Sequence, residues 1–164
     1  MFKIKLLILL PLSIIILACS KSNQEEPSSK YSLSYIGGEY DGLLFKNLLT
    51  NHLKSVNLYD EKSTYQINAE INHESNIFIT NIDNTSDREN ITSTLSIEIN
   101  HRKLDCNIFR DDFTVRQFYI YASSNKLLSN QKADKKIKKE NSAALIKQFI
   151  NKLNKIELTC NESK

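Results

Sequence analysis

Glycine is scarce in this sequence, with three residues among 164, and tryptophan is absent. So few glycines would hardly build a glycine-rich phosphate loop or a Gly-x-Ser-x-Gly nucleophile elbow, and neither motif occurs. The histidines His52, His73 and His101 are scattered, with no carboxylate or cysteine at metal-ligand spacing. Asp111 and Asp112 are adjacent, so on a strand they would point to opposite faces. We therefore expect no catalytic residues, no metal and no cofactor, and a role in binding or assembly.

Cysteine is equally rare, occurring only at Cys19, Cys106 and Cys160. The chain has no Cys-x-x-Cys pair, which argues against a redox motif or a zinc ribbon. If Cys19 has a separate role, the other two cysteines form an even pair. Such a pair is typical of an oxidising compartment such as the periplasm.

The N-terminus has the pattern of a lipoprotein signal peptide. Lys3 and Lys5 precede an apolar run over residues 6–17, which is shorter than the about 20 residues of a membrane span. Ile16-Leu17-Ala18-Cys19 resembles the bacterial lipobox. We expect residues 1–18 to be removed and Cys19 to carry the lipid anchor. The alternatives are an ordinary secretory signal with a coincidental cysteine, or an uncleaved anchor.

Residues 20–30, SKSNQEEPSSK, contain no large apolar side chain and are typical of a flexible tether. Ser20 stands where an aspartate would retain a lipoprotein in the inner membrane, so we expect the outer membrane, on its periplasmic face. The domain organisation follows: a signal peptide at 1–18, a lipidated tether at 19–30, one folded domain at 31–158 and a tail at 159–164.

Positive charge is concentrated in the C-terminal part of the chain. The formal net charge is +3, and loss of Lys3 and Lys5 with the signal leaves +1. Residues 126–156 hold nine lysines against Asp134 and Glu140, a local charge of +7, so the rest of the mature chain carries −6. This basic segment is either a solvated surface or a contact for an anionic partner, such as lipid phosphate or an acidic barrel wall. The expected compartment excludes nucleic acid.

Hydrophobic periodicity predicts six elements in the order β-α-β-β-β-α. Alternating apolar residues indicate strands at 31–35, 65–79 with a break near 74–76, 91–100 and 106–120, with turns at 82–90 and 101–105. Helical spacing indicates helices at 43–56 and 126–156. Asp41 is a candidate N-cap or first-turn acid of the first helix. The fold class expected is α+β, a two-layer sandwich with about four mainly antiparallel strands and two helices on one face.

Element lengths predict a disulfide between Cys106 and Cys160. The last strand, from about 106 to 120, spans roughly 50 Å at ~3.3 Å per residue. The final helix spans roughly 46 Å at ~1.5 Å per residue and must run antiparallel to that strand if a short loop joins them. Its end therefore returns to the start of the strand. The alternative is two unpaired cysteines, with Cys106 half-buried in the sheet and Cys160 in a frayed tail.

Several short stretches carry a resemblance to a known family. They are Asp41-Gly42-Leu43-Leu44 with Asn47-Leu48-Leu49, then Asn84-Thr85-Ser86-Asp87-Arg88 with Leu95, and finally 119–122 with the helix end at 146–153. Together with the lipobox and the element order, they resemble the lipopolysaccharide-assembly lipoprotein family LptE, especially its alphaproteobacterial branch. The resemblance covers most of residues 31–156. The chain departs from the family pattern just after Cys19, in a glycine-free turn at 101–105 and in its lysine-rich last helix.

The resemblance implies a non-enzymatic, two-layer α/β plug inside the outer-membrane barrel that inserts lipopolysaccharide. Such a protein helps to assemble its LptD-like barrel and binds lipopolysaccharide. Arg88 is the first candidate contact, because a planar guanidinium suits phosphate. The further candidates are Lys135, Lys136, Lys138 and Lys139. Other functions to be separated are an auxiliary lipoprotein of a lipid-trafficking ABC transporter, an activator lipoprotein of cell-wall synthases and a periplasmic hydrolase.

Overall fold

The computed structural model describes residues 29–78, 88–120 and 126–160. The expected signal peptide, Cys19, most of the tether and the turn residues 82–87 lie outside the described residues. The elements are β1 (Tyr31–Gly37), α2 (Glu39–Ser55), β2 (Tyr65–Phe78), β3 (Arg88–His101), β4 (Cys106–Ile120) and α3 (Leu127–Leu153). Their order, β-α-β-β-β-α, confirms the predicted fold class. No helix in this part of the chain is long and apolar enough to span a membrane.

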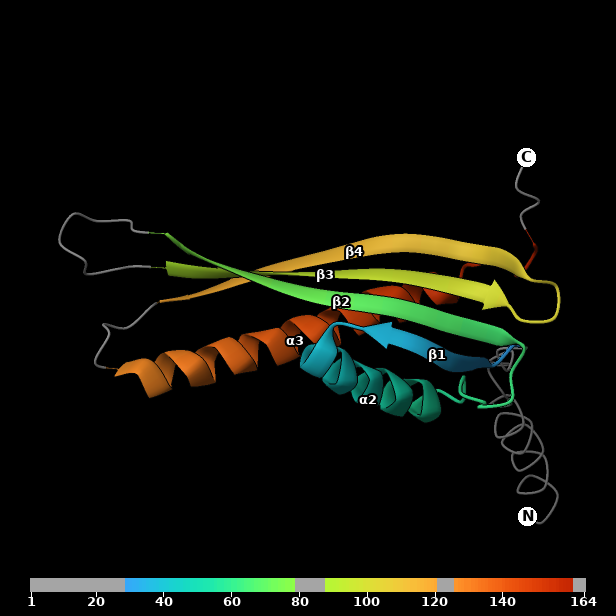
Figure 1. Cartoon of the computed structure of the whole chain (residues 1–164), viewed down its shortest axis with the longest axis horizontal. Coiled ribbons are helices and arrows are strands. Elements are labelled where there is room, and N and C mark those ends of the chain that lie inside the picture. The colour runs from blue at the N-terminus through green and yellow to red at the C-terminus, as the bar shows by residue number, and fades with distance from the viewer. Residues whose placement is uncertain (1–28, 79–87, 121–125, 161–164) are drawn as a thin grey trace, which may run out of the picture.

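The sheet has four strands in the order β1-β2-β3-β4, and both helices lie on one of its faces (Figure 1). The two long hairpins are antiparallel, and β2 pairs with β3 without interruption from Tyr65↔His101 to Phe78↔Arg88. By contrast, β1 is parallel to β2, because α2 carries the chain back across the sheet between them. We call the end at Phe78, Arg88 and Ile120 the distal end of the sheet, and the end at Tyr31 the proximal end.

The core fills the space between the helices and one face of the sheet. Alternation in β2 and β3 brings every second side chain to that face, and helical spacing brings matching residues from α2 and α3. The fully buried members are Phe45, Leu49, Leu53, Ile67, Leu95, Ile99, Leu145 and Phe149. The alternation predicted in β3 from Ile91 to Ile99 is confirmed. The helical spacing of 126–156 would also place Leu127 on the buried face of the last helix. This residue is exposed, because it lies in the first turn of α3, at the distal end.

The first helix begins four residues earlier than predicted. Gly38 is its N-cap, with a φ of 108° that L side chains rarely adopt. A Cβ at Gly38 would also lie 2.4 Å from the carbonyl oxygen of Ile71. Asp41 is therefore a first-turn acid and not the N-cap. β1 ends at Gly37, and Gly38 then allows an abrupt turn from β1 into α2.

The distal strands are longer than predicted. No break occurs in β2 near 74–76, because each residue of this stretch pairs with β3, as in Ser75↔Ile91. Residues 88–90 were assigned to a turn but belong to β3. Polar sequence suggested a loop here, and cross-strand pairing overrides that preference.

The two helices differ in length, which divides the sheet into two halves. α2 starts near mid-sheet, where β1 ends opposite Glu70, and returns to the proximal end, where Tyr59 pairs with Tyr31. α3 has 27 residues against 17 in α2 and runs beneath the sheet from the distal to the proximal end (Figure 1). The proximal half is therefore covered by two helices, and the distal half by α3 alone.

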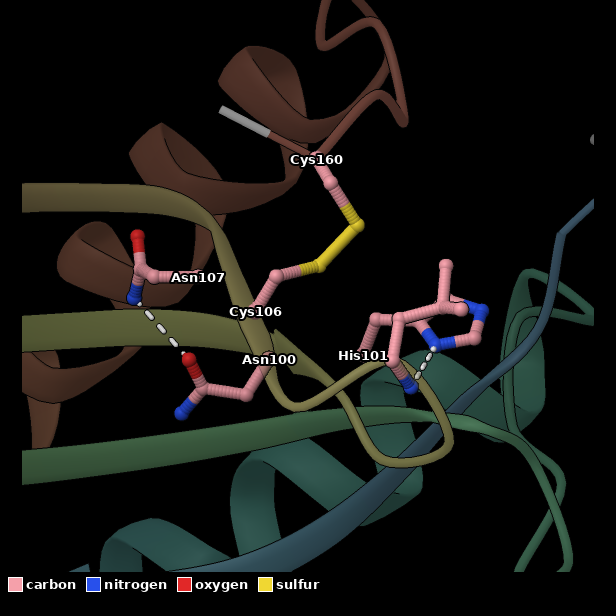
Figure 2. The surroundings of a disulfide bond; sticks show 6 residues. Asn100, His101, Cys106, Asn107 and Cys160 are labelled. Atoms are coloured by element: carbon pink, nitrogen blue, oxygen red, sulfur yellow. Dashed lines mark hydrogen bonds between the residues drawn. A yellow bond between two sulfur atoms is a disulfide. The ribbon is translucent and has the colours of Figure 1, made fainter. Parts of the chain in front are cut away.

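A disulfide ties the C-terminal segment to the sheet. Cys160 lies beyond the end of α3 and is bonded to Cys106, the first residue of β4, with a Cα–Cα distance of 5.8 Å (Figure 2). The antiparallel course of α3 returns the chain to this point, as the element lengths predict. In the turn next to it, Asp105 adopts a φ of 48°, so an aspartate occupies a backbone conformation that glycine often supplies.

Replacement of both cysteines, in Cys106→Ser/Cys160→Ser, is expected to lower the free energy of unfolding by about 3–4 kcal/mol. The bond joins residues 54 apart in sequence, and its loss enlarges the conformational freedom of the unfolded chain. Urea unfolding of the wild type under oxidising and reducing conditions provides the comparison. The reduced wild type should match the double variant. Equal midpoints for oxidised wild type and variant would contradict this prediction.

Candidate functional site

Arg88 lies at the distal end of the sheet, on the face that the helices do not cover. It opens β3 and pairs with Phe78 of β2 on one side and Ile120 of β4 on the other. Its guanidinium lies 5.1 Å from the centroid of the Phe118 ring, a cation–π distance. Among the described residues, no carboxylate forms an ion pair with Arg88. A guanidinium has the planar donor geometry that suits phosphate.

The four candidate lysines lie on α3, in the opposite layer from Arg88. Lys135, Lys136 and Lys139 are exposed, and Lys136 forms an ion pair with Glu140 at 3.8 Å. Lys138 differs from them, because it is partly buried and bonded to Asp134 at 3.1 Å. Arg88 and the exposed lysines are thus not brought together on one flat surface.

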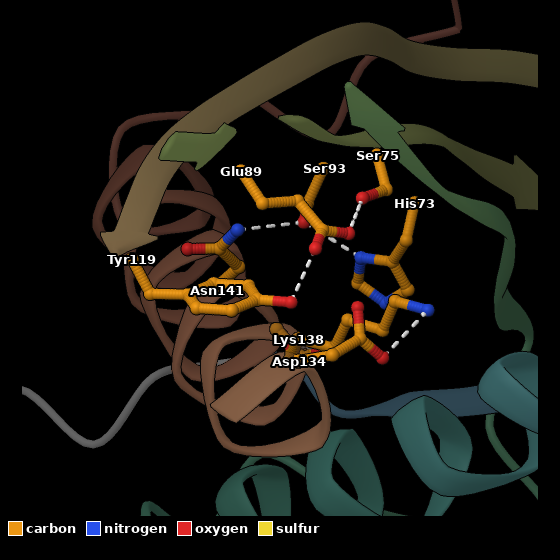
Figure 3. Close-up of polar contacts among 9 residues, drawn as sticks. His73, Ser75, Glu89, Ser93, Tyr119, Asp134, Lys138 and Asn141 are labelled. Carbon is orange, nitrogen blue, oxygen red and sulfur yellow. Dashed lines mark hydrogen bonds and ion pairs between the residues drawn. The ribbon is translucent and has the colours of Figure 1, made fainter. Parts of the chain in front are cut away.

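A group of polar side chains fills the space between α3 and the distal half of the sheet (Figure 3). We call it the distal polar cluster; it consists of His73, Ser75, Glu89, Ser93, Tyr119, Asp134, Lys138 and Asn141. His73 Nδ1 lies 2.6 Å from Ser93 Oγ, and Asn141 Nδ2 donates to the same oxygen at 2.8 Å. Ser75 and Tyr119 both donate hydroxyl hydrogen bonds to the Glu89 carboxylate.

The hydrogen bonds of Ser93 are compatible with a neutral His73. Ser93 Oγ accepts an N–H from Asn141, which leaves its hydroxyl proton available to His73 Nδ1. In that arrangement the imidazole is neutral and carries its proton on Nε2. Asn141 is fully buried, and its Oδ1 atom has no hydrogen-bond partner in the part of the chain that is described. Such an atom is costly to bury, so the cluster is a weak point of the core.

The electrostatic environment supports a neutral His73. Burial lowers the pKa of His73 below its ordinary value of 6.5. The carboxylates of Asp41 on α2 and Asp134 on α3 act in the opposite direction, while Lys138 adds to the effect of burial. The charged groups that face the imidazole thus come from both helices.

A serine hydrogen-bonded to a histidine also occurs in hydrolases, but the surroundings of this pair differ. Ser93 has no exposed surface, since its side chain lies on the face of β3 that α3 covers. A substrate could not reach its hydroxyl in this conformation, so the pair serves packing and polar pairing. Nor do the described residues contain a group of three His, Cys, Asp or Glu side chains able to hold a metal ion.

Sequence reasoning missed the distal polar cluster, although one signal was present. Ser93 is the only polar residue on the buried face of β3 between Ile91 and Ile99. That interruption could have indicated a polar partner on the opposite layer. The identity of the partners depends on which turn of α3 lies above Ser93, and the sequence does not specify this.

No protein-family model matches the chain, and no curated protein matches its sequence. Solved structures do match. A minor lipoprotein from Acinetobacter baumannii is 13% identical, with a TM-score of 0.59 over 81% of this chain and 97% of its own. The rare lipoprotein B from Shewanella oneidensis is 10% identical, with a TM-score of 0.61 over 77% of this chain and 95% of its own. A putative lipoprotein from Caulobacter crescentus is 10% identical, with a TM-score of 0.52 over 73% of this chain and 83% of its own.

The chain has the fold of these bacterial lipoproteins. At such low identities the likeness concerns the fold alone. It extends over most of the described domain and nearly the whole of two of the lipoproteins.

Acidification is expected to destabilise the protein through His73. Below about pH 6.5 the unfolded chain binds a proton that the folded imidazole resists, so stability falls as the pH drops through this value toward the lowered folded pKa. His73→Gln should remove this part of the stability loss at low pH, since an amide does not titrate. Melting temperatures from roughly pH 7.5 to 5.5 report it. His52→Gln is the matched control, and a pH profile for His73→Gln that follows the wild type would refute the prediction.

Proposed function

We propose that this protein is a non-enzymatic outer-membrane lipoprotein that plugs and helps to assemble the lipopolysaccharide-transport barrel. In this role it binds lipopolysaccharide during insertion into the outer membrane. The observation that carries the proposal is the fold shared with bacterial lipoproteins, combined with the lipobox at Cys19 and the LptE-like stretches. The structural similarity to known lipoproteins supports the assignment as a bacterial lipoprotein. The barrel partner and the lipopolysaccharide ligand are proposed from the resemblance to the LptE family.

The uncovered face of the sheet suits a barrel lumen. Between its two ends this face carries short polar and charged side chains, and the lumen of a large outer-membrane barrel is also polar. The members on the central strands are Asn68, Glu70, Asn72, Glu74, Thr92, Thr94, Ser96 and Glu98. A flat polar surface of this kind can pair with polar wall residues and bridging water without burying unsatisfied groups.

The dimensions of the domain also agree with an upright plug. β2 makes thirteen steps from Tyr65 to Phe78, about 43 Å at ~3.3 Å per residue. A bilayer with its headgroups is about 40–45 Å thick. The tether enters at the proximal end, so an anchor in the periplasmic leaflet would direct the distal end toward the opposite leaflet.

Affinity purification of the tagged full-length protein from its own envelope tests the proposal. The wild type should incorporate labelled palmitate, fractionate with the outer membrane and co-purify with a large β-barrel protein and lipopolysaccharide. Cys19→Ala should accumulate as an unprocessed or mislocalised precursor, because two acyl chains are needed for stable anchoring. Recovery of an ABC transporter or a cell-wall synthase in place of the barrel would select the corresponding alternative function.

Reversal of the three exposed lysines, in Lys135→Glu/Lys136→Glu/Lys139→Glu, should weaken lipopolysaccharide binding in a salt-sensitive way. Each basic residue near an anionic lipid surface contributes about 1 kcal/mol, so the affinity at low salt should fall roughly hundredfold. The effect should shrink as salt screens the charges. Equilibrium binding to labelled lipopolysaccharide at two ionic strengths measures it.

The control for this experiment reverses three other exposed lysines, Lys46, Lys62 and Lys103, which alters the net charge equally. Lys138 is left unchanged, because its ion pair with Asp134 gives Lys138→Glu a structural cost. Equal losses in the two triple variants would attribute binding to net charge alone. Unchanged binding in the first variant would assign the lysines to an ordinary solvated surface.

A further inference from the structure

Three large apolar side chains are exposed at the distal end of the uncovered sheet face. Phe78, Phe118 and Ile120 are 53%, 57% and 68% exposed, and none of them belongs to the core. The register places Phe78 and Ile120 on either side of Arg88 in one row across three strands, with Phe118 one row away on the same face. We call these three residues the distal apolar patch.

The patch contrasts with the rest of the same face. One row further along β3 the face carries Asn90, and beyond it Thr92 and Thr94. Three further apolar side chains are exposed near the distal end of the sheet, namely Ile77 of β2 and, at the start of α3, Leu127 and Leu128. Such a concentration at one end of a domain indicates contact with another apolar surface.

Charge at the distal end identifies the kind of surface. Arg88 lies in the centre of the patch and has no ion pair among the described residues. Lys126, the N-cap of α3, and Lys132, in its second turn, are both exposed. The carboxylate of Glu89, the next residue, points to the other face of the sheet and accepts hydrogen bonds from Ser75 and Tyr119. Apolar side chains around a guanidinium match a ligand that has hydrocarbon chains and a negatively charged headgroup.

We propose that the distal apolar patch binds the acyl chains of an anionic lipid, with the Arg88 guanidinium on the lipid phosphate. The inference rests on the proposed function, because only an upright plug would hold the patch at the level of the leaflet opposite the lipid anchor. The inference adds three apolar residues to the proposed site. The acyl chains of the lipid contact Phe78, Phe118 and Ile120, and the positive charge of Arg88 selects an anionic headgroup.

A single tryptophan tests the patch, because the chain contains none. The mature lipoprotein carrying Phe118→Trp is anchored in phosphatidylcholine vesicles. A second vesicle population then supplies lipids with brominated acyl chains, which quench indole fluorescence on contact. This population is made with phosphatidylglycerol, with lipid A or with phosphatidylcholine alone. We expect a blue shift and quenching with the two anionic lipids and little change with phosphatidylcholine.

Two variants sharpen the result. In the Phe118→Trp background, Arg88→Gln should weaken the anionic-lipid effect about fivefold, which corresponds to one basic residue at a lipid surface. Tyr40→Trp, at a site 69% exposed at the start of α2, is the matched control and should remain unquenched. Melting curves show that each variant retains the fold.

Several outcomes would overturn the proposal. Absence of quenching at Phe118→Trp excludes acyl contact, and equal quenching at Tyr40→Trp shows unspecific adsorption. Equal quenching by phosphatidylcholine removes the role of Arg88. A dimer that Phe118→Ser disrupts would assign the patch to a second copy of the chain. No barrel protein is present in this vesicle assay. Lipid binding by the patch can therefore be refuted while co-purification with a barrel succeeds, and lipid binding can be found while co-purification fails.

Discussion

The structure depends on burying one face of a long sheet beneath two helices of unequal length. β2, β3 and β4 have 14 to 15 residues, α3 has 27 and α2 has 17. Each helix covers a strip of the sheet that is limited by its own length. Where both helices cover the sheet, isoleucine, leucine and phenylalanine form a dense core. Where only α3 covers it, the space cannot be closed by apolar packing alone, and polar groups take part.

The distal half differs from the proximal half for this reason. Its inner face holds the hydrogen-bonded chain His73–Ser93–Asn141, and its outer face ends in apolar side chains around Arg88. Features of this kind reduce the stability of an isolated domain, because the buried amide oxygen of Asn141 has no partner among the described residues and aromatic rings contact water. The proximal half offsets this loss with its dense core and the Cys106–Cys160 bond. The domain thus has a more stable proximal end and a less stable distal end.

The polar face, the basic helix surface and the apolar distal end present three different chemistries on one small domain. A protein that acts by contact with several environments at once requires such a division. In the proposed function these environments are a polar barrel lumen, anionic lipid headgroups and hydrocarbon chains. The arrangement needs no catalytic residue, since each contact acts through charge, shape or burial.

The sequence determined the elements of the fold. Period-two alternation in residues 91–99 and helical spacing in 126–156 are local patterns, and the burial of one face follows directly from them. The return of the last helix to Cys106 also followed from lengths alone. The sequence could not give the start of α2 at Glu39 or the continuity of β2, because these depend on the conformation of Gly38 and on pairing with β3.

The candidate site was only partly determined by the sequence. Composition and the family resemblance selected Arg88 and four lysines as cations for an anionic ligand. Only the tertiary structure separated them into two layers and placed Phe78 and Phe118 next to Arg88. It also decided that Ser93 would meet His73 and Asn141. The contacts of Ser93 with His73 and Asn141, and of Arg88 with Phe118, join residues 20 or more apart in sequence. They depend on strand register and helix position, which no local pattern specifies.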